Sequence, residues 1–315
     1  MEIIHICPAN FATGGTESIH QLVNALNRIN NISAKILYVN WDRKDVPRPK
    51  EYIKYNCDYM TEFPYGFKGC VIFPEVYGNQ AVEPQYKDCI VGMNWAGVDV
   101  YDWNVPEKER GIYLQRKDMI HIARSKYAVD YLAKKGLKSV EVACIVSDEF
   151  FESYTEQPRT NTVLYNGVIF KLTEFQKAVM ARCKEKYDVA FMPLINYTRE
   201  QMIKRFRGSK LYIDFGEFSG RERIPREAAL NGCCVLTSRL GCAGYYEDVS
   251  IPDEYKFNTD EVERAVEKII YVLQNYDKCR ADFDCYRDSL KHDREIYQSQ
   301  VKELCNEILN HHSCI

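Results

Sequence analysis

The chain has 315 residues, which at about 150 residues per domain predicts two domains. Hydrophobic residues make up 46% and charged residues 28%, a composition typical of globular proteins that excludes an intrinsically disordered chain. Lys and Arg total 42 against 45 for Asp and Glu, and the formal net charge of −3 gives no support to nucleic-acid binding, which favours a strongly basic chain.

The N-terminus and the cysteines indicate a cytoplasmic protein. No stretch approaches the roughly 18 apolar residues of a membrane span, and residues 1–5 lack the basic and apolar segments of a secretory signal. The 13 cysteines are odd in number and include no CxxC pair. We therefore expect free, buried thiols rather than disulfides or a zinc site, and no metal or other cofactor.

The first forty residues have the pattern of a βαβ unit. A β-rich run at residues 2–7 is followed by a loop at 8–15, and a second strand is expected at 34–40. Thr16 is the expected N-cap of the helix between them. The helix is indicated by apolar residues that recur on one face: Ile19, Leu22, Val23, Leu26 and Ile29.

Short apolar runs continue through the first half of the chain. Strands are expected at 70–74, 88–94, 119–124 and 140–145, and a helix at 125–135. This alternation predicts a parallel sheet with right-handed crossovers. The charged segment 147–160 lacks periodicity and is interpreted as a linker.

The alternation restarts after the linker. Strands are expected at 162–165, 188–192, 210–215 and 233–237, with helices at 172–186, 198–207 and 225–231, and the pattern beyond residue 259 is helical only. We therefore expect an α/β protein with two Rossmann-like domains, at residues 1–155 and 156–290. The C-terminal helix at 291–315 is expected to pack back on the N-terminal domain.

Gly14 and Gly15 precede the first expected helix. Glycine lets backbone N–H groups approach a ligand, and a helix N-terminus presents free donors and a partial positive charge. The pair suits a phosphate or a developing negative charge, although glycines that only turn the chain into the helix explain it equally well. The spacing is neither a dinucleotide-binding GxGxxG nor a P-loop.

The most informative region is 212–235, where a strand is followed by a Gly-rich charged loop, a helix and the next strand. Pro225 fits the first turn of that helix. Glu227 is expected in the same turn, at the sheet edge where α/β proteins bind ligands. Its carboxylate suits the vicinal hydroxyls of a ribose, and Arg221 and Arg223 suit a diphosphate.

This region resembles the donor site of retaining glycosyltransferases of the GT-B fold, family 4-like. The resemblance is carried by the run IPREAALNGCCV at 224–235 and by LGCAG at 240–244, followed by Glu247. Asn166, after a strand and before Gly167, is similar to the opening of the family's nucleotide-binding half, and the loop at 14–15 resembles its first N-terminal loop. The resemblance implies two Rossmann-like domains with a central cleft and C-terminal helices.

The resemblance also implies roles for individual residues. Glu227 would bind the nucleotide ribose, Asn166 would belong to the donor site, and Gly14 and Gly15 would lie beside the donor phosphate and the acceptor. In the family an Arg/Lys pair that holds the pyrophosphate follows the first strand of the second half, where Lys171 stands here.

Two departures from the family pattern affect the donor site. The partner of Lys171 in the pyrophosphate pair is not at its usual place, and Arg221 or Arg223 is our substitute on grounds of charge and location. The family's donor-sugar acid stands eight positions before the ribose glutamate, where this chain has Ser219. Glu217 or Glu222 is left for that contact.

Four residues of the first half are further candidates. His121 lies where a family histidine contacts the donor sugar, and a satisfied core histidine is the competing interpretation. Trp95 and Asp99 belong to an aromatic and acidic loop suited to stacking on an acceptor sugar, and an exposed loop whose tryptophans pack inward is the alternative. Glu75 follows a strand and is an acceptor-site candidate.

A basic stretch lies between Lys108 and Lys138, with nine Lys or Arg and three acidic residues. It suits peripheral contact with an anionic membrane that carries a lipid-linked acceptor. Solvated helix faces explain the same charge.

The resemblance implies a retaining, metal-independent glycosyltransferase that moves a sugar from a nucleotide-sugar to a glycan or lipid-linked acceptor, in surface polysaccharide synthesis. A GT-A enzyme would hold a metal with a DxD motif after a mid-chain strand, whereas the DxD of this chain, at 282–284, lies in the helical C-terminal region. Two alternatives stay open: a sugar-nucleotide epimerase or hydrolase, and a non-catalytic nucleotide- or glycan-binding protein with a degenerate site.

Overall fold

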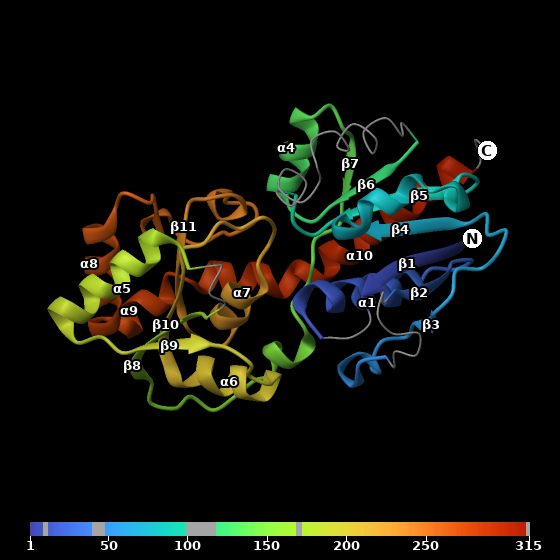
Figure 1. Cartoon of the computed structure of the whole chain (residues 1–315). Coiled ribbons are helices and arrows are strands. Elements are labelled where there is room, and N and C mark those ends of the chain that lie inside the picture. The colour runs from blue at the N-terminus through green and yellow to red at the C-terminus, as the bar shows by residue number, and fades with distance from the viewer. Residues whose placement is uncertain (9–11, 40–47, 99–117, 168–171, 313–315) are drawn as a thin grey trace. The chain divides into compact units, whose positions relative to one another are not determined.

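The computed structural model describes residues 1–8, 12–39, 48–98, 118–167 and 172–312 (Figure 1). The chain divides into two compact units, of which the first is Met1–Cys144 with Glu295–Ile315 and the second is Ile145–Arg294. Each unit contains a parallel sheet, which confirms the predicted fold class. Of the helices in the described ranges, none has both the length and the apolar character that crossing a bilayer requires.

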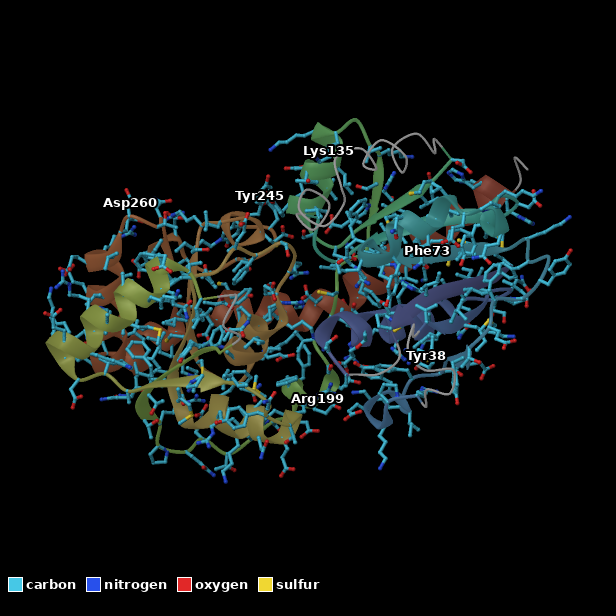
Figure 2. All side chains as sticks on the ribbon, viewed as in Figure 1. Tyr38, Phe73, Lys135, Arg199, Tyr245 and Asp260 are labelled. Atoms are coloured by element: carbon cyan, nitrogen blue, oxygen red, sulfur yellow. The ribbon has the colours of Figure 1, made fainter. Side chains whose placement is uncertain are left out.

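The sheet of the first unit has seven parallel strands in the order β3-β2-β1-β4-β5-β6-β7. They are β1 (Glu2–Pro8), β2 (Ser33–Val39), β3 (Asp58–Met60), β4 (Cys70–Pro74), β5 (Ile90–Trp95), β6 (Ile120–Ala123) and β7 (Ser139–Glu141). All residues of β4 and β5 are buried, including Phe73 (Figure 2). Central strands of a parallel sheet are covered on both faces, so their sequences are continuous apolar runs.

Helix α1 (Gly14–Leu26) begins earlier than the sequence predicts. The N-cap is Thr13, not Thr16: the Thr13 side chain accepts from the backbone N–H of Thr16, and the Thr16 hydroxyl accepts from the backbone N–H of Thr13. This reciprocal capping box satisfies two donors of the first turn. Gly14 and Gly15 therefore belong to the first turn of the helix rather than to a loop in front of it.

The other described helices between β2 and β7 are short. Helix α4 (Lys126–Lys134) is capped by Ser125, whose hydroxyl accepts from the backbone N–H of Ala128. Three 3-10 helices, η1 (Lys50–Tyr52), η2 (Glu75–Val82) and η3 (Pro84–Tyr86), connect strands. Every cysteine in the described ranges has a free thiol and most are buried, as the cysteine pattern predicted.

The sheet of the second unit has five parallel strands in the order β12-β11-β10-β8-β9. They are β8 (Thr160–Asn166), β9 (Phe191–Leu194), β10 (Ser209–Asp214), β11 (Cys234–Ser238) and β12 (Lys256–Phe257). The strand expected at 188–192 starts later, because Asp188 takes the left-handed conformation that ends the preceding helix. A residue with φ of 49° cannot continue into a strand.

Six helices complete the described part of the C-terminal half: α5 (Glu174–Tyr187), α6 (Arg199–Gly208), α7 (Arg223–Leu230), α8 (Val262–Gln274), α9 (Tyr276–Ala281) and α10 (Asp284–His312). Thr173 and Thr198 are the N-caps of α5 and α6. Short 3-10 helices form at η4 (Asp148–Phe151), η6 (Cys242–Gly244) and η7 (Asp253–Tyr255). Helix α10 contributes residues 284–294 to the second unit and 295–312 to the first.

The guanidinium of Arg159 ties together three segments of the second unit. Its Nη1 donates to the carbonyls of Phe206 and Ser209, at 2.8 and 2.9 Å, and its Nη2 donates to the Tyr154 hydroxyl and the Asn231 carbonyl, at 2.8 and 2.9 Å. The carbonyls belong to the C-terminal ends of α6 and α7, where intrahelical partners run out. Arg159 therefore closes two helix ends at once.

We predict that Arg159→Met lowers the free energy of unfolding by about 3 kcal/mol or more, because it leaves several buried acceptors without a donor. Urea unfolding followed by far-UV circular dichroism measures the change. The matched control is Lys204→Met on α6, an exposed side chain, for which we expect less than about 0.5 kcal/mol. Equal losses in the two variants would contradict the role of Arg159.

Candidate active site

The strand order of the second sheet contains a topological switch point. After β8 the chain adds β9 on one side of it and β10 on the other. Open α/β sheets bind ligands at the carboxyl ends of strands beside such a switch point. Those ends are Asn166 of β8 and Asp214 of β10. The loop at 215–222, called the donor loop for its predicted role, therefore leaves the sheet at the switch point.

The loop that follows β10 is fixed by hydrogen bonds. The Asp214 carboxylate accepts from the Tyr212 hydroxyl at 2.9 Å and from the backbone N–H of Gly216 at 3.2 Å. The backbone N–H of Phe215 donates to Gln176 Oε1 at 3.0 Å, and the Ser238 hydroxyl donates to the Gly216 carbonyl at 2.6 Å. The start of the donor loop is therefore held by α5 and β11.

Glu227 lies in the second turn of α7, because the helix begins at Arg223; the sequence placed it one turn too early. Its side chain is buried, and its Oε1 lies 3.5 Å from Nε of Arg223. Nη2 of Arg223 also donates to the Ser147 hydroxyl at 2.6 Å. The arginine and the carboxylate on successive turns thus form one anchored charge pair.

Arg221, the other arginine predicted to bind a diphosphate, makes hydrogen bonds to other parts of the second unit. Nη2 of Arg221 donates to both carboxylate oxygens of Asp293, each at 3.1 Å, and its Nε donates to the Asp248 carbonyl. Buried Arg226 donates to the carbonyls of Arg221 and Glu222. These contacts hold the chain that leads into α7, and a role of Arg221 in donor binding stays a prediction.

The other donor-site candidates have different surroundings. Asn166 is buried at the end of β8, Glu217 is exposed in the loop after β10, and Glu222 directly precedes α7. Lys171 and Asp99 lie outside the described residues. Their roles, and those of the three described candidates, stay predictions.

In the first unit the switch point lies between β1 and β4, and Gly14 and Gly15 begin the helix that follows β1. Both glycines are exposed. The Tyr52 hydroxyl lies 3.0 Å from the backbone nitrogen of Thr13 and 2.7 Å from Thr16 Oγ1. The Tyr52 hydroxyl therefore holds the first turn of α1 in place, and the two glycines of that turn stay exposed to solvent.

Of the described candidates from the N-terminal half, Glu75 directly follows β4, Trp95 ends β5, and His121 is the second residue of β6. Trp95 is the last residue of β5 and is 3% exposed, so it is not part of an exposed loop. Its Nε1 donates to Nδ1 of His121 at 3.1 Å. The Glu75 carboxylate accepts from the backbone N–H groups of Ala96 and Gly97, both at 3.2 Å. The inward-packed alternative therefore describes Trp95.

A series of hydrogen bonds that the sequence did not predict links three buried polar side chains of the first unit. Nε of Arg124 donates to Asn94 Oδ1 at 2.6 Å, the Asn94 amide donates to His5 Nε2 at 2.9 Å, and His5 Nδ1 donates to the Ile6 carbonyl at 2.9 Å. The available signal was a polar residue at or directly after the end of two apolar runs. All three side chains are buried.

Burial keeps three histidines of the first unit neutral. It lowers the pKa of His5 to about 3 and the pKa values of His20 and His121 to about 4. Each ring has a partner that suits the neutral form: Nδ1 of His121 accepts from Trp95, and Nε2 of His20 accepts from the Tyr38 hydroxyl at 2.7 Å. His121 thus has the surroundings of a core histidine.

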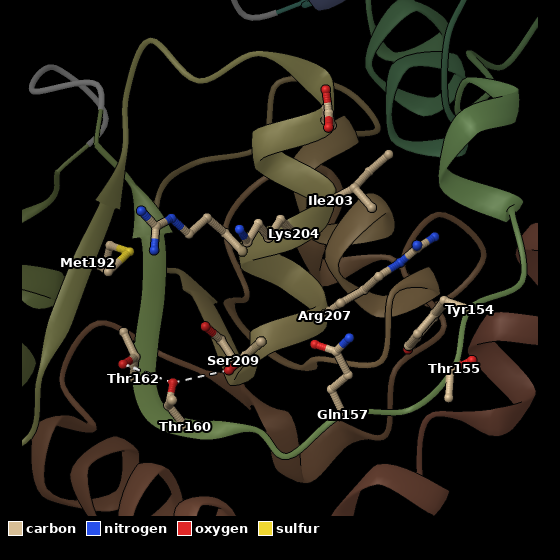
Figure 3. Close-up of a pocket in the computed structure, with 13 residues that line it drawn as sticks. Tyr154, Thr155, Gln157, Thr160, Thr162, Met192, Ile203, Lys204, Arg207 and Ser209 are labelled. Atoms are coloured by element: carbon tan, nitrogen blue, oxygen red, sulfur yellow. Dashed lines mark hydrogen bonds between the residues drawn. The ribbon is translucent and has the colours of Figure 1, made fainter.

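A cavity of about 790 Å³ lies in the second unit (Figure 3). It is lined by α6, by residues 154–157 and by the beginnings of β8 and β10, where Thr160 Oγ1 donates to the Gly208 carbonyl at 3.1 Å. Asn166 and Asp214 stand at the opposite ends of these strands. The cavity is therefore separate from the donor loop.

The basic stretch is only partly described. Lys108, Arg110, Arg116 and Lys117 lie outside the described residues. Arg124 is buried, Lys126 pairs with Asp130 at 3.0 Å, and Lys138 lies 3.5 Å from Glu307.

Across the described ranges, no group of three or more His, Cys, Asp or Glu side chains is placed to hold a metal ion.

No protein-family model and no curated protein matches this chain. Solved structures match it over nearly its whole length. Sucrose-phosphate synthase from Thermosynechococcus elongatus has 14% identity and a TM-score of 0.71, covering 98% of this chain and 99% of that chain. A glycosyltransferase from Rickettsia africae ESF-5 has 13% identity and a TM-score of 0.67, with 98% of each chain covered.

Alr3699/HepE from Anabaena, in complex with UDP and glucose, has 9% identity and a TM-score of 0.67, covering 97% of this chain and 100% of that chain. At these identities the matches show the fold. The chain has the GT-B architecture, with a parallel sheet in each of two units and C-terminal helices.

We predict that the first unit loses stability as the pH falls from about 6.5 toward 4. In this window an unfolded histidine binds a proton while the folded His20 or His121 does not, so each lowers the free energy of unfolding by about 1.4 kcal/mol per pH unit. Urea unfolding at pH 7, 6 and 5, followed by tryptophan fluorescence, measures the slope.

The variant His121→Gln should reduce this slope by about 1.4 kcal/mol per pH unit, because one of the depressed pKa values is removed. The exposed His292→Asn is the matched control and should leave the slope as it is. An unchanged slope in His121→Gln would mean that His121 is protonated equally in both states.

Proposed function

We propose that this protein is a glycosyltransferase that moves a sugar from a nucleotide-sugar donor to an acceptor hydroxyl. The second unit binds the donor and the first unit binds the acceptor. The observation that carries the proposal is the anchored pair of Arg223 and Glu227 beside the switch point of a chain that matches GT-B glycosyltransferases over its length.

A UDP-sugar is the donor that the structural neighbours support. Anabaena HepE is known in complex with UDP-glucose, and the Escherichia coli trehalose-6-phosphate protein is bound with UDP-2-fluoro glucose. In our proposal the Glu227 carboxylate accepts hydrogen bonds from the two ribose hydroxyls. A carboxylate with two oxygens suits adjacent hydroxyl donors.

The diphosphate leaving group needs cationic partners rather than a metal in this proposal. Arg223 is the described cation nearest the Glu227 carboxylate, and the exposed first turn of α1 offers backbone N–H groups and a positive dipole end. The protein would lower the barrier by positioning the reactants and stabilising the departing charge. Retention of the anomeric configuration follows from the resemblance of the run 224–235.

Acceptor recognition is assigned to the carboxyl edge of the first sheet, with Glu75, Trp95 and Asp99, of which Asp99 lies outside the described residues. His121 in β6 is assigned to the donor sugar. A glycan or lipid-linked acceptor and a role in surface polysaccharide synthesis complete the proposal. Exposed Lys134, Lys135 and Lys138, at and after the end of α4, are the described part of a surface for peripheral membrane contact.

We predict that Glu227→Gln weakens UDP binding at least tenfold, because the loss of a charged acceptor removes about 1.5 kcal/mol or more of hydrogen bonding. Isothermal titration calorimetry with UDP measures the dissociation constant, in buffer with EDTA and in buffer with magnesium. The exposed Glu267→Gln of α8 is the matched control and should bind as the wild type does. Equal binding by both variants would remove Glu227 from the donor site.

The fate of a bound UDP-sugar separates transfer from the other functions. Formation of a glycoside with retained configuration, seen by NMR, supports the proposal. UDP release at the same rate without acceptor indicates a hydrolase, an isomerised donor indicates an epimerase, and binding without turnover indicates a binding protein. Any of these three outcomes would overturn the proposal.

We predict that Gly15→Ala stabilises the protein by up to about 1 kcal/mol yet lowers turnover at least tenfold. The new methyl group would meet only Thr13 Oγ1, at 3.8 Å, and alanine favours the helix. In the ternary complex the same methyl group would occupy the space through which donor phosphate and acceptor approach the backbone.

Thermal unfolding and initial rates on the same preparation measure the two effects. Gly208→Ala at the end of α6 is the matched control, since its methyl group also meets open space, and its turnover should equal that of the wild type. A Gly15→Ala variant with normal turnover would leave the glycine a purely structural role.

A further inference from the structure

Arg124 is a buried cation at the carboxyl edge of the first sheet. It directly follows β6, and its side chain is 2% exposed. Through Asn94 and His5 the guanidinium is hydrogen-bonded to two further strands, β5 and β1. The His5 ring accepts from Asn94 only while Nε2 is unprotonated, which the low pKa of about 3 ensures. The plane of the guanidinium is thereby fixed.

Most of the donor capacity of Arg124 is unused within the described residues. A guanidinium carries five N–H groups, and among the described residues only its Nε makes a hydrogen bond. Its Nη2 is buried without a partner there, and so is the hydroxyl of Tyr297 in α10, a side chain that is 3% exposed. The backbone N–H of Val142 donates to the Ala123 carbonyl at 2.8 Å, and the backbone N–H of Ala143 donates to Gln300 Oε1 of α10 at 3.0 Å. Helix α10 therefore passes beside the chain that carries Arg124, and Tyr297 lies one turn before Gln300.

Arg124 also has no ion-pair partner among the described residues. No carboxylate of the described residues lies within 4 Å of it, although its charge acts on Glu75 and lowers the pKa that burial raises. The Glu75 oxygens are occupied by backbone N–H groups of the loop after β5. A buried cation without a close anion costs several kcal/mol, so the site is built for a second negative group.

We propose that Arg124 and Tyr297 bind an anionic group, a phosphate or a carboxylate, carried by the acceptor sugar. Two Nη groups on one rigid plane match two oxygens of such a group, and the tyrosine hydroxyl donates to the same group. The location at the strand ends is where an open α/β sheet receives ligands. The inference rests on the proposed function, because it assigns the anion to an acceptor.

Calorimetric titration of the full chain with inorganic phosphate, glucuronate and glucose tests this assignment, with and without saturating UDP. UDP fills the donor site, so phosphate that still binds is at a second site. We expect phosphate or glucuronate to bind the wild type at least tenfold more tightly than glucose. The tighter of the two names the group that the site takes.

Two variants locate the binding. Arg124→Gln should weaken anion binding at least thirtyfold, and Tyr297→Phe, which keeps the ring in place, at least fivefold. Both should keep the UDP affinity of the wild type. The exposed Arg28→Gln of the first unit is the matched control for nonspecific charge and should bind the anion normally.

Three results would overturn the inference: no anion binding to the wild type, equal affinity for glucose and glucuronate with no phosphate binding, or unchanged anion binding in both variants. Failure of UDP to bind the wild type contradicts the proposed function instead. In that case the titrations without UDP still decide whether Arg124 and Tyr297 form an anion site.

Discussion

Parallel pairing of the strands is the constraint on which the positions of all candidate residues depend. In both sheets each strand pairs in parallel with its neighbours. Every connection must therefore run back along the sheet, and all carboxyl ends gather at one edge. Strands β4 and β5 are buried along their whole length. The polar candidates Glu75 and Arg124 of the first sheet directly follow strands, and Asn166 and Asp214 of the second sheet are the last residues of theirs.

Three buried arginines show how differently this fold treats a charge. Arg159 donates to carbonyls at the ends of two helices, and Arg226 donates to carbonyls of the chain entering α7 and lies 3.6 Å from Asp293. Arg159 offsets its desolvation at the C-terminal ends of two helices, and Arg226 offsets its own through two backbone carbonyls and the nearby carboxylate. Arg124 lies instead at a sheet edge, with a single hydrogen bond to the described residues. Arg159 makes four hydrogen bonds to the described residues and Arg226 makes two, so Arg124 has the most donor capacity left of the three.

The parts of the structure that local pattern determines could be predicted. Strand β4 matches the expected 70–74, because a central parallel strand is apolar throughout. Strands β3 and β12 were missed, since two or three residues carry no periodicity. The predicted start of α1 was wrong because Thr13 and Thr16 are both good N-cap residues; the hydrogen bonds that Tyr52 makes to both come from far along the chain and have no local signal. The link from Asn94 to His5 spans 89 residues and has no local signal.

Gly241 and Gly15 differ in whether the surrounding structure requires glycine. Gly241 has φ of 58°, and a methyl group there would lie 2.3 Å from the Phe218 carbonyl oxygen, so the second unit itself requires glycine at this turn. Gly15 is helical, and a methyl group would meet nothing closer than 3.8 Å. Glycine in a first helical turn costs stability relative to alanine. The fold of the described residues therefore gives no steric reason for glycine at position 15, and the proposed approach of donor and acceptor to the backbone of α1 is the reason that remains.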